Sequence, residues 1–440
     1  MNSIQERNVL YLEIKLRSPL ALSSGEDEWT DSDILRDFDG NPFVPGSSLA
    51  GAFRTYLGKV KNEPCLMGYF ANGSAGRMSS LYISDLLFRE NPVTNVRDGV
   101  ALNEYKTAVQ GSKFDMEIME ANALGYFFVE YVIREKDDKQ LMEDELSKII
   151  QGIQSGEIRL GSKKTRGFGQ FTIETLKEAC FNKENYCDYA NVYALTYWNG
   201  KNCPGNCLEK WLNRVDIQNN MIHITIPLLL TGGISIRRYA AKKGEPDFVQ
   251  LTDHGEAVVP GSSLAGALRH RMKKILRELE KGGWSLPVSA STLIESSFGY
   301  VTGDQACSSN IIVGETEVKG ATPLTMVRTG ISRFESAVRD GTLYKEITYV
   351  GGTAQVEILV KKESYEEDTK WMVGLLLLAI KDLQNGLLAV GGQTAIGRGV
   401  FSSNGPILID GKENEEDDWI ANSLNSLGVF AQREAKKNGF

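Results

Sequence analysis

The chain has 440 residues, of which 42% are hydrophobic and 24% are charged, and its formal net charge is −8. These values are typical of an ordinary soluble globular protein that is long enough for two or three domains. The longest apolar run, residues 372–380, is too short to cross a bilayer, and residues 1–16 do not form a secretory signal, so we expect a cytoplasmic protein without a membrane partner.

The first half of the chain predicts strands and helices in alternation. Residues 9–16 show the partial alternation of a half-buried strand, and a polar loop follows at residues 23–37. The next elements are the octamer PGSSLAGA, a strand, a V-R-D-G segment with a polar excursion, an alternating stretch and a glycine-rich turn (residues 45–52, 80–86, 95–113, 114–120 and 161–171).

The second half repeats this order and contains the identical octamer, PGSSLAGA, at residues 260–267. The matching landmarks are shifted by about 215 to 232 positions, as a tandem duplication with loop insertions produces. The order of elements predicts the α+β class, with a ferredoxin-like arrangement in each half. We expect a first domain, a connector, a second domain and an acidic C-terminal tail (residues 1–177, 178–217, 218–410 and 411–440).

The octamer predicts the start of a helix. Proline and glycine make a turn, a serine caps the helix, and the small residues leave backbone N–H groups open to a phosphate. A basic residue, Arg54 or Arg269, follows in each half. The alternative is a capped helix whose small residues pack against a sheet, but two identical copies favour phosphate contacts by the first residues of each helix (Gly46, Ser47, Ser48, Ser262 and Ser263).

The glycine-rich turns at residues 161–171 and 391–401 are not nucleotide-binding loops, because neither has the order of a Walker A motif. Their basic residues would suit a polynucleotide backbone, although a structural hairpin is the alternative. A net negative charge argues weakly against a nucleic acid partner. It is a poor guide when charges of opposite sign are segregated, and here the basic residues are clustered. We therefore expect RNA contacts from two basic segments and the last turn (Lys163, Lys164, Arg166, Arg237, Arg238, Lys242, Lys243 and Arg398).

Each polar loop carries two aspartates six positions apart, Asp31 with Asp37 and Asp247 with Asp253. A loop carboxylate beside a phosphate can hold a divalent ion or act as a general base, whereas a solvated aspartate is the structural alternative. The chain has three histidines with no matched pair between the halves, so acid–base catalysis by histidine is not expected.

Four of the cysteines, Cys180, Cys187, Cys203 and Cys207, lie in the connector. Disulfides are not expected in the cytoplasm, so one interpretation is a structural Zn²⁺ site. The spacing lacks the close Cys-x-x-Cys pairs of common zinc modules, and free buried thiols are the alternative.

Taken together, these landmarks resemble the RAMP superfamily of CRISPR-associated proteins, in particular the backbone subunits of type III (Csm and Cmr) effector complexes. The resemblance covers about residues 1–175 and 220–405 and rests on five landmarks that occur twice in the same order: the loop aspartate, PGSSLAG, the M-G-Y or F-G-Y segment, the V-R-D-G or V-R-T-G segment, and the glycine-rich turn. It describes a fused tandem of two RRM-like RAMP domains with hairpin and loop insertions.

The resemblance implies a subunit that binds guide RNA and target RNA within a complex of several CRISPR subunits. Residues 98–113 and 329–343 would be thumb hairpins that displace a nucleotide. Asp31, with Asp33 as its rival, and Asp247 would cleave the target as a metal-dependent endoribonuclease with Mg²⁺ or Mn²⁺, at positions about six nucleotides apart.

Two other interpretations remain open at this stage. The chain would be a scaffold if it binds RNA without cleaving it, and Pro246 with the basic run before Asp247 would move that aspartate away from its phosphate. A guide-processing RAMP endonuclease acting alone is the other, although such enzymes usually lack this helix start and the tandem.

Overall fold

The computed structural model describes residues 3–437, apart from residues 24, 26–29, 59–65, 70–75, 104–106, 201–202, 217–219, 240–245, 285, 287 and 304. The chain divides into two compact units. The first unit comprises Met1–Arg97, Phe114–Lys164 and Phe168–Gln218, and the second comprises Asp98–Lys113, Thr165–Gly167 and Asn219–Phe440. Both units combine helices with mostly antiparallel sheets, which confirms the α+β class.

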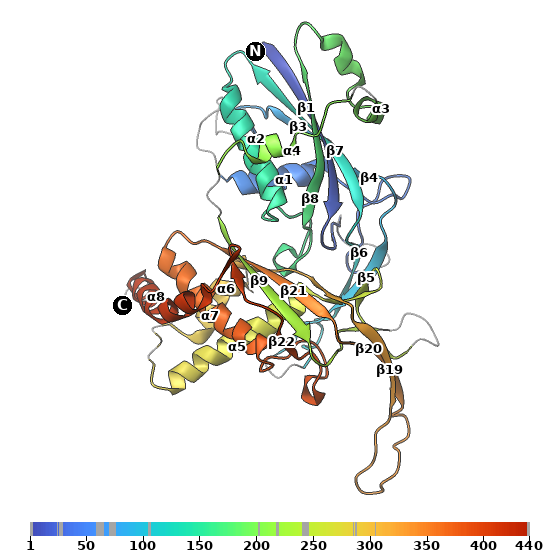
Figure 1. Cartoon of the computed structure of the whole chain (residues 1–440), viewed down its shortest axis with the longest axis vertical. Helices are drawn as coiled ribbons and strands as arrows, with labels where there is room; N and C mark the ends of the chain where they lie inside the picture. The colour runs from blue at the N-terminus through green and yellow to red at the C-terminus, as the bar shows by residue number, and fades with distance from the viewer. Residues whose placement is uncertain are drawn as a thin grey trace. The chain divides into compact units, whose positions relative to one another are not determined.

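The first unit contains a six-stranded sheet of order β2-β4-β7-β1-β8, with β3 also paired to β7 (Figure 1). These strands are β1 Ile4–Leu16, β2 Phe43–Val44, β3 Leu81–Ile83, β4 Leu86–Phe88, β7 Leu124–Arg134 and β8 Phe171–Phe181. The central strand β1 pairs antiparallel with β7 and β8. Its alternation sends Leu10 and Leu12 into the core on one face and Val9 and Tyr11 into an aromatic cluster on the other.

Two helices, α1 Gly46–Leu57 and α2 Lys139–Gln154, cover the first face of this sheet (Figure 1). The N-cap of α1 is Pro45, whose side chain makes no capping hydrogen bond. The carbonyl oxygen of Pro45 accepts the backbone N–H of Ser48 over 2.9 Å. Pro260 begins the matching helix in the same way, so the expected serine caps were wrong, because in each copy the turn closes on the proline carbonyl.

The connector segment folds onto the first unit. The turns η2 Tyr186–Asn191 and α3 Leu195–Asn199 cover the second face of the sheet, where the ring of Trp198 stacks on Tyr11 at 5.5 Å. The short helix α4 Leu208–Leu212 packs against α2, and the hydroxyl of Ser147 donates to the carbonyl oxygen of Trp211 over 2.6 Å. Both faces of the first sheet are therefore covered by protein.

The second unit has a larger sheet of order β13-β14-β18-β21-β9-β23-β24, to which β17 and β22 add by pairing with β21 and β9. Its strands are β9 Met221–Leu230, β13 Thr252–Asp253, β14 Glu256–Val259, β17 Ile311–Val313, β18 Thr316–Lys319, β21 Thr353–Lys361, β22 Phe401–Ser403, β23 Leu408–Ile409 and β24 Lys412–Glu413. The core contains β9 and the buried faces of three helices, α5 Gly261–Lys281, α6 Ala290–Phe298 and α7 Glu366–Gln384.

The C-terminal segment forms a further helix, α8 Glu416–Lys437, which packs along α7 (Figure 1). Leu427 and Phe430 are buried in the same core as α7, and the Phe430 ring lies 5.3 Å from that of Trp371. The part described above as an acidic tail is thus a packed helix whose acidic residues precede and begin it. Among the described residues, no helix is both long and apolar enough to cross a membrane.

A hairpin also forms around each of the two polar excursions of the sequence. The first is β5 Thr94–Gly99 with β6 Phe114–Met119. The second belongs to a five-stranded sheet of order β10-β20-β12-β11, with β19 paired to β20 (β10 Gly233–Ile234, β11 Arg237–Tyr239, β12 Phe248–Gln250, β19 Thr322–Arg328 and β20 Tyr344–Val350). The β19–β20 hairpin projects from the rest of the second unit (Figure 1), and a smaller hairpin joins β15 Tyr300–Thr302 to β16 Gln305–Cys307.

The two glycine-rich turns have the same backbone path. Each contains a short 3₁₀ turn, η1 Lys164–Arg166 or η3 Thr394–Ile396, followed by a glycine with positive φ, 75° at Gly169 and 70° at Gly399. A Cβ at Gly399 would overlap the carbonyl oxygen of Val390, so this glycine is required by both conformation and space.

We expect Gly399→Ala to lower the free energy of unfolding by more than about 2 kcal/mol, because it combines backbone strain with a backbone overlap. Gly397→Ala is the matched control, since Gly397 also has positive φ, 84°, but a Cβ there meets open space. Urea titration of both variants measures the difference. Equal losses for the two would show that the close approach at Gly399 has no effect.

Candidate functional site

In the first unit, the loop before α1 carries an aspartate that is tied to the start of a strand. Asp31 is exposed, and its Oδ2 accepts a 3.0 Å hydrogen bond from the backbone N–H of Asp115, the second residue of β6. The backbone N–H of Asp31 in turn donates to Asp115 Oδ1 over 2.9 Å. The two carboxylates therefore lie side by side at the base of the β5–β6 hairpin.

The second unit repeats this arrangement. Asp247 is exposed, and its Oδ2 accepts a 2.8 Å hydrogen bond from the backbone N–H of Lys345, the second residue of β20. Asp31 and Asp247 thus hold the same position relative to the strand that returns from the hairpin. The units differ in the neighbouring side chain, because Lys345 stands where the first unit has Asp115.

Asp33, the rival of Asp31, has a different environment. It is 8% exposed, and one carboxylate oxygen accepts a 2.5 Å hydrogen bond from Thr30 Oγ1. This buried carboxylate stabilises the loop from within, whereas that of Asp31 faces solvent. The geometry therefore favours Asp31 as the aspartate that a substrate reaches.

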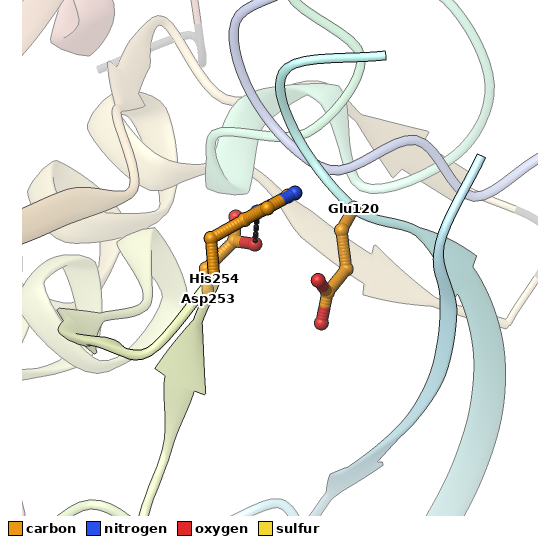
Figure 2. A group of neighbouring side chains, drawn as sticks. All are labelled: Glu120, Asp253 and His254. Atoms are coloured by element: carbon orange, nitrogen blue, oxygen red, sulfur yellow. Dashed lines mark hydrogen bonds and ion pairs between the residues drawn. The ribbon is translucent and has the colours of Figure 1, made fainter. Parts of the chain in front are cut away.

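The downstream aspartates of the two loops hold turns. Asp37 Oδ1 accepts the backbone N–H of Asn41 over 2.8 Å, and this and similar backbone hydrogen bonds lower the pKa of Asp37. Asp253 is buried, and its Oδ1 lies 2.7 Å from Nδ1 of His254 (Figure 2). His254 and Gly255 both have positive φ, 47° and 88°, which makes a tight turn between β13 and β14. Sequence reasoning gave histidine no role and missed this pair.

The start of α1 is already occupied by a carboxylate. The backbone N–H of Gly46 donates to Asp85 Oδ1 over 2.7 Å. Gly46 is buried, and a Cβ there would overlap the carbonyl oxygen of Ile83, so the glycine is needed for packing against the sheet edge. A carboxylate at a helix N-terminus opposes a second anion there, which argues against the predicted phosphate contact of Gly46.

The other predicted ligands at the helix starts lie at or near the surface. Arg54 is exposed, but its guanidinium donates to the carbonyl oxygens of Met67 and Gly68 over 2.6 and 3.1 Å, so it also holds the chain that follows α1. The remaining positions are exposed or half-buried and stay predicted RNA ligands (Ser47, Ser262 and Arg269 exposed; Ser48 and Ser263 half-buried).

The first glycine-rich turn places one cation, Lys163, against the base of the first hairpin. Lys163 Nζ lies 4.1 Å from the centre of the Phe114 ring, and Phe114 is the first residue of β6. Lys164 and Arg166 are exposed. The aromatic member of this pair, Phe114, directly precedes Asp115, the partner of Asp31, in β6.

Arg398, in the second glycine-rich turn, is not at the surface. Its side chain is 7% exposed and lies 3.2 Å from Glu346 Oε1, and Glu346 is fully buried. Its guanidinium also donates to Thr348 Oγ1 over 2.9 Å and to Gln393 Oε1 over 3.0 Å. The structure thus argues against a phosphate contact by Arg398 and gives it a role in the interior.

The matching positions of the first unit are apolar. When the two halves are aligned, Phe168 corresponds to Arg398, Met116 to Glu346 and Ile118 to Thr348. Phe168, Met116 and Ile118 form a small buried cluster. The same three positions are therefore filled by apolar side chains in the first unit and contain a buried ion pair in the second.

A second cation–aromatic surface lies beside Asp247. The guanidinium of Arg237 lies 3.8 Å from the centre of the Phe248 ring, and the Phe248 ring meets that of Tyr344 at 5.9 Å. Arg238 is half-buried, whereas Lys242 and Lys243 lie outside the described residues. Sequence reasoning missed these two aromatic residues, although the signal was present, because an aromatic residue, Phe114 or Tyr344, begins the returning strand in each half.

The hairpin segments expose apolar side chains to solvent. Phe334 is 98% exposed, and Ile331 and Val338, which form a bridge across the second hairpin, are 66% and 63% exposed. In the first hairpin Leu102, bridged to Ala108, is 57% exposed. Exposed apolar groups on a narrow projection are suited to insertion between stacked bases.

The four cysteines of the connector are not brought together. Cys203 Sγ lies 3.6 Å from Lys177 Nζ, whereas Cys207 Sγ lies 3.4 Å from the carbonyl oxygen of Leu176 and packs against the helix-covered core. Neighbouring residues of β8 point to opposite faces, so the sheet separates these thiols. Among the described residues, which include all four cysteines, no three of them lie within 4.8 Å of one another, and they do not fit the predicted Zn²⁺ site.

The thiols are expected to differ in reactivity. Burial and the nearby Glu178 carboxylate raise the pKa of Cys207, which lowers its thiolate fraction at a given pH, whereas Cys187 is exposed. Iodoacetamide at pH 8 should therefore modify Cys187 before Cys207 in the native protein, as followed by mass spectrometry. In denaturant the two should react alike. If neither thiol reacts in the native protein and the protein contains bound zinc, the predicted Zn²⁺ site would be supported instead.

Comparison with known proteins matches the duplicated parts of the chain. The family model described as the RAMP superfamily matches residues 13–172 and 226–402, which is more than half of the chain. A relative from Streptococcus thermophilus, "CRISPR system Cms endoribonuclease Csm3", is 29% identical over 171 residues. That alignment covers 33% of this chain and 76% of the relative.

Proposed function

The chain belongs to the RAMP superfamily and carries two RAMP domains in tandem, and we propose that it binds guide RNA and cleaves complementary target RNA as a backbone subunit of a type III CRISPR effector complex. The observation that carries this proposal is the matched placement of Asp31 and Asp247. Each exposed carboxylate is fixed by a backbone N–H at the base of a hairpin. The name of the relative supports endoribonuclease activity in a related chain.

The aspartates can act on an RNA backbone in two ways. A carboxylate accepts a proton or orients a hydroxyl, and it also ligates Mg²⁺ or Mn²⁺, which bind to one or two carboxylates together with phosphates and water. In the first unit Asp31 and Asp115 supply two adjacent carboxylates, so the residues fit such an ion. A bound ion would stabilise charge on the phosphate.

The proposed reaction is attack of a ribose 2′-hydroxyl on the adjacent phosphate. The bond from the 2′-oxygen to phosphorus forms, the bond from phosphorus to the 5′-oxygen breaks, and the 2′ proton passes to the aspartate or to water. The products are a cyclic 2′,3′-phosphate and a 5′-hydroxyl, which takes up a proton. The hairpins would contribute by unstacking one nucleotide, which places the 2′-oxygen in line with the leaving oxygen.

One observation points to slower cleavage by the second unit than by the first. Lys345 replaces the second carboxylate that Asp115 provides in the first unit, and Asp247 follows directly after Pro246. A cation there attracts phosphate but weakens the binding of a metal ion. We therefore propose that the first unit is the faster nuclease and that the second retains RNA binding.

The test uses the assembled complex with an end-labelled RNA complementary to its guide. The proposal expects two cuts in this RNA and no cut in a non-complementary RNA of equal length. EDTA should abolish both cuts and leave RNA binding in place. Binding of the complementary RNA without any cut would establish the scaffold function instead.

A further inference from the structure

Arg328 ends β19, directly before residues 329–343 of the second hairpin. Its Nε lies 3.1 Å from Glu346 Oε1, and its Nη2 lies 3.5 Å from Met326 Sδ. The side chain is 34% exposed, and within the part of the chain that the structure describes its Nη1 has no partner. The guanidinium is thus held at one edge, and its other edge remains open to a ligand.

Two arginines share the carboxylate of Glu346. Arg398, with a 7% exposed side chain, already pairs with the same Oε1 at 3.2 Å, and Gln393 donates to Oε2 over 2.7 Å. Arg398 therefore neutralises Glu346, and Arg328 adds one uncompensated positive charge to the cluster. Because Arg328 is half-buried and Arg398 is buried, that charge is presented at the surface by Arg328.

The surroundings of Arg328 are those of a polynucleotide site. Tyr344 lies opposite Arg328 in the β19–β20 register, and its ring contacts that of Phe248, which Arg237 covers. The next residue of β20, Lys345, holds Asp247 through its backbone N–H. Guanidinium groups that flank aromatic rings combine phosphate binding with base stacking.

We propose that Arg328 binds a phosphodiester group of RNA at the base of the second hairpin, and that the buried Glu346 is its positioning residue. This inference rests on the proposed function, because it assumes that RNA crosses the hairpin base. The first unit lacks the same exposed group: the corresponding Arg97 is 8% exposed and lies over the Phe168 ring at 5.7 Å. We therefore expect the two units to differ at this position. The second unit offers RNA a fixed cation, whereas the first keeps its arginine packed against an aromatic ring.

The first measurement is the affinity of the full chain for a fluorescent single-stranded oligouridylate over a range of KCl concentrations. Arg328→Gln should weaken binding and reduce the slope of log K against log salt by about 0.7, the value for one phosphate contact on a single strand. Lys361→Gln is the matched control, because it removes one positive charge from an exposed position on β21 and should leave the slope unchanged.

Glu346→Gln separates positioning from net charge. The variant makes the chain more positive, so charge alone would strengthen RNA binding, whereas loss of the anchor for Arg328 should weaken it. Arg328→Lys keeps the charge without the planar fork, and it should weaken binding with little change in slope. Thermal melting of each variant verifies that the chain is folded before binding is compared.

The outcomes distinguish this inference from the proposed function. If the wild-type complex cuts target RNA but Arg328→Gln binds with the wild-type slope, the inference is wrong and the proposed function stands. If no cut occurs but Arg328→Gln still loses one contact, the phosphate site stands without the nuclease. If Arg328→Gln and Lys361→Gln change the slope of log K against log salt equally, the inference is overturned, because the change would then reflect net charge alone.

Discussion

Replacing Asp31 by asparagine should remove one of the two cuts in the target RNA and leave the other cut and RNA binding unchanged. Asparagine keeps an oxygen that accepts the backbone N–H of Asp115, so the loop should stay in place, but it cannot take a proton or attract a metal ion as a carboxylate does. Loss of a general base typically slows cleavage by about 10²- to 10⁴-fold. Single-turnover cleavage of end-labelled RNA by the assembled complex measures both cuts in one reaction.

Asp247→Asn should remove the other cut, and the double variant should bind RNA without cutting it. Asp39→Asn is the control, because it removes one carboxylate from the same loop as Asp31 at an exposed turn. Wild-type cleavage by the double variant would mean that neither aspartate is catalytic. If Asp31→Asn loses cleavage whereas Asp247→Asn cleaves like the wild type, duplication kept RNA binding in both units and the chemistry in one.

The second large effect concerns stability. Glu346→Met should lower the free energy of unfolding by about 3–5 kcal/mol, because it leaves the buried Arg398 guanidinium without its carboxylate. Adding Thr348→Ile and Arg398→Phe to that variant should restore stability to within about 1 kcal/mol of the wild type. These three residues are the ones that the first unit carries at the same places, in its cluster of Met116, Ile118 and Phe168.

Denaturant titration of the full chain measures both variants. Glu357→Met, at an exposed position of β21, is the control and should change stability by less than about 0.5 kcal/mol. A triple variant as unstable as Glu346→Met would show that the surroundings of the ion pair have diverged too far to accept the apolar set. A small effect of Glu346→Met alone would show that Arg398 reaches solvent when its partner is removed.

The duplication and the pairing of its parts could be read from the sequence, because an identical octamer and an ordered series of landmarks recur at nearly constant spacing. The family match in each half confirms the tandem. The pairing of Asp31 with Asp247 also came from spacing, and the structure gives both the same hydrogen bond to the returning strand. The sequence named Asp31 with Asp33 as a close rival, and burial separates the two, because Asp33 is buried whereas Asp31 is exposed.

Several ligands were assigned on residue type alone, and here the sequence was insufficient. The helix start that looked open to phosphate is capped by Asp85, which is 39 positions away along the chain. Cysteines that are close in the connector are separated by the sheet, because strand neighbours Leu176 and Lys177 face opposite sides. Such arrangements depend on which strands pair, and no local pattern contains that information.

The sequence by itself determined the tandem duplication of this protein, its α+β fold class and the loops in which its aspartates lie, since these follow from local periodicity and repetition. Tertiary structure decided which charged groups are available for binding. Arg398 is buried and Arg328 is only half-buried, although both lie against the same carboxylate, because β20 carries Glu346 into the interior between them. Whether a basic residue meets RNA or supports the fold is set by burial and by its partners, and both are properties of the packed sheet.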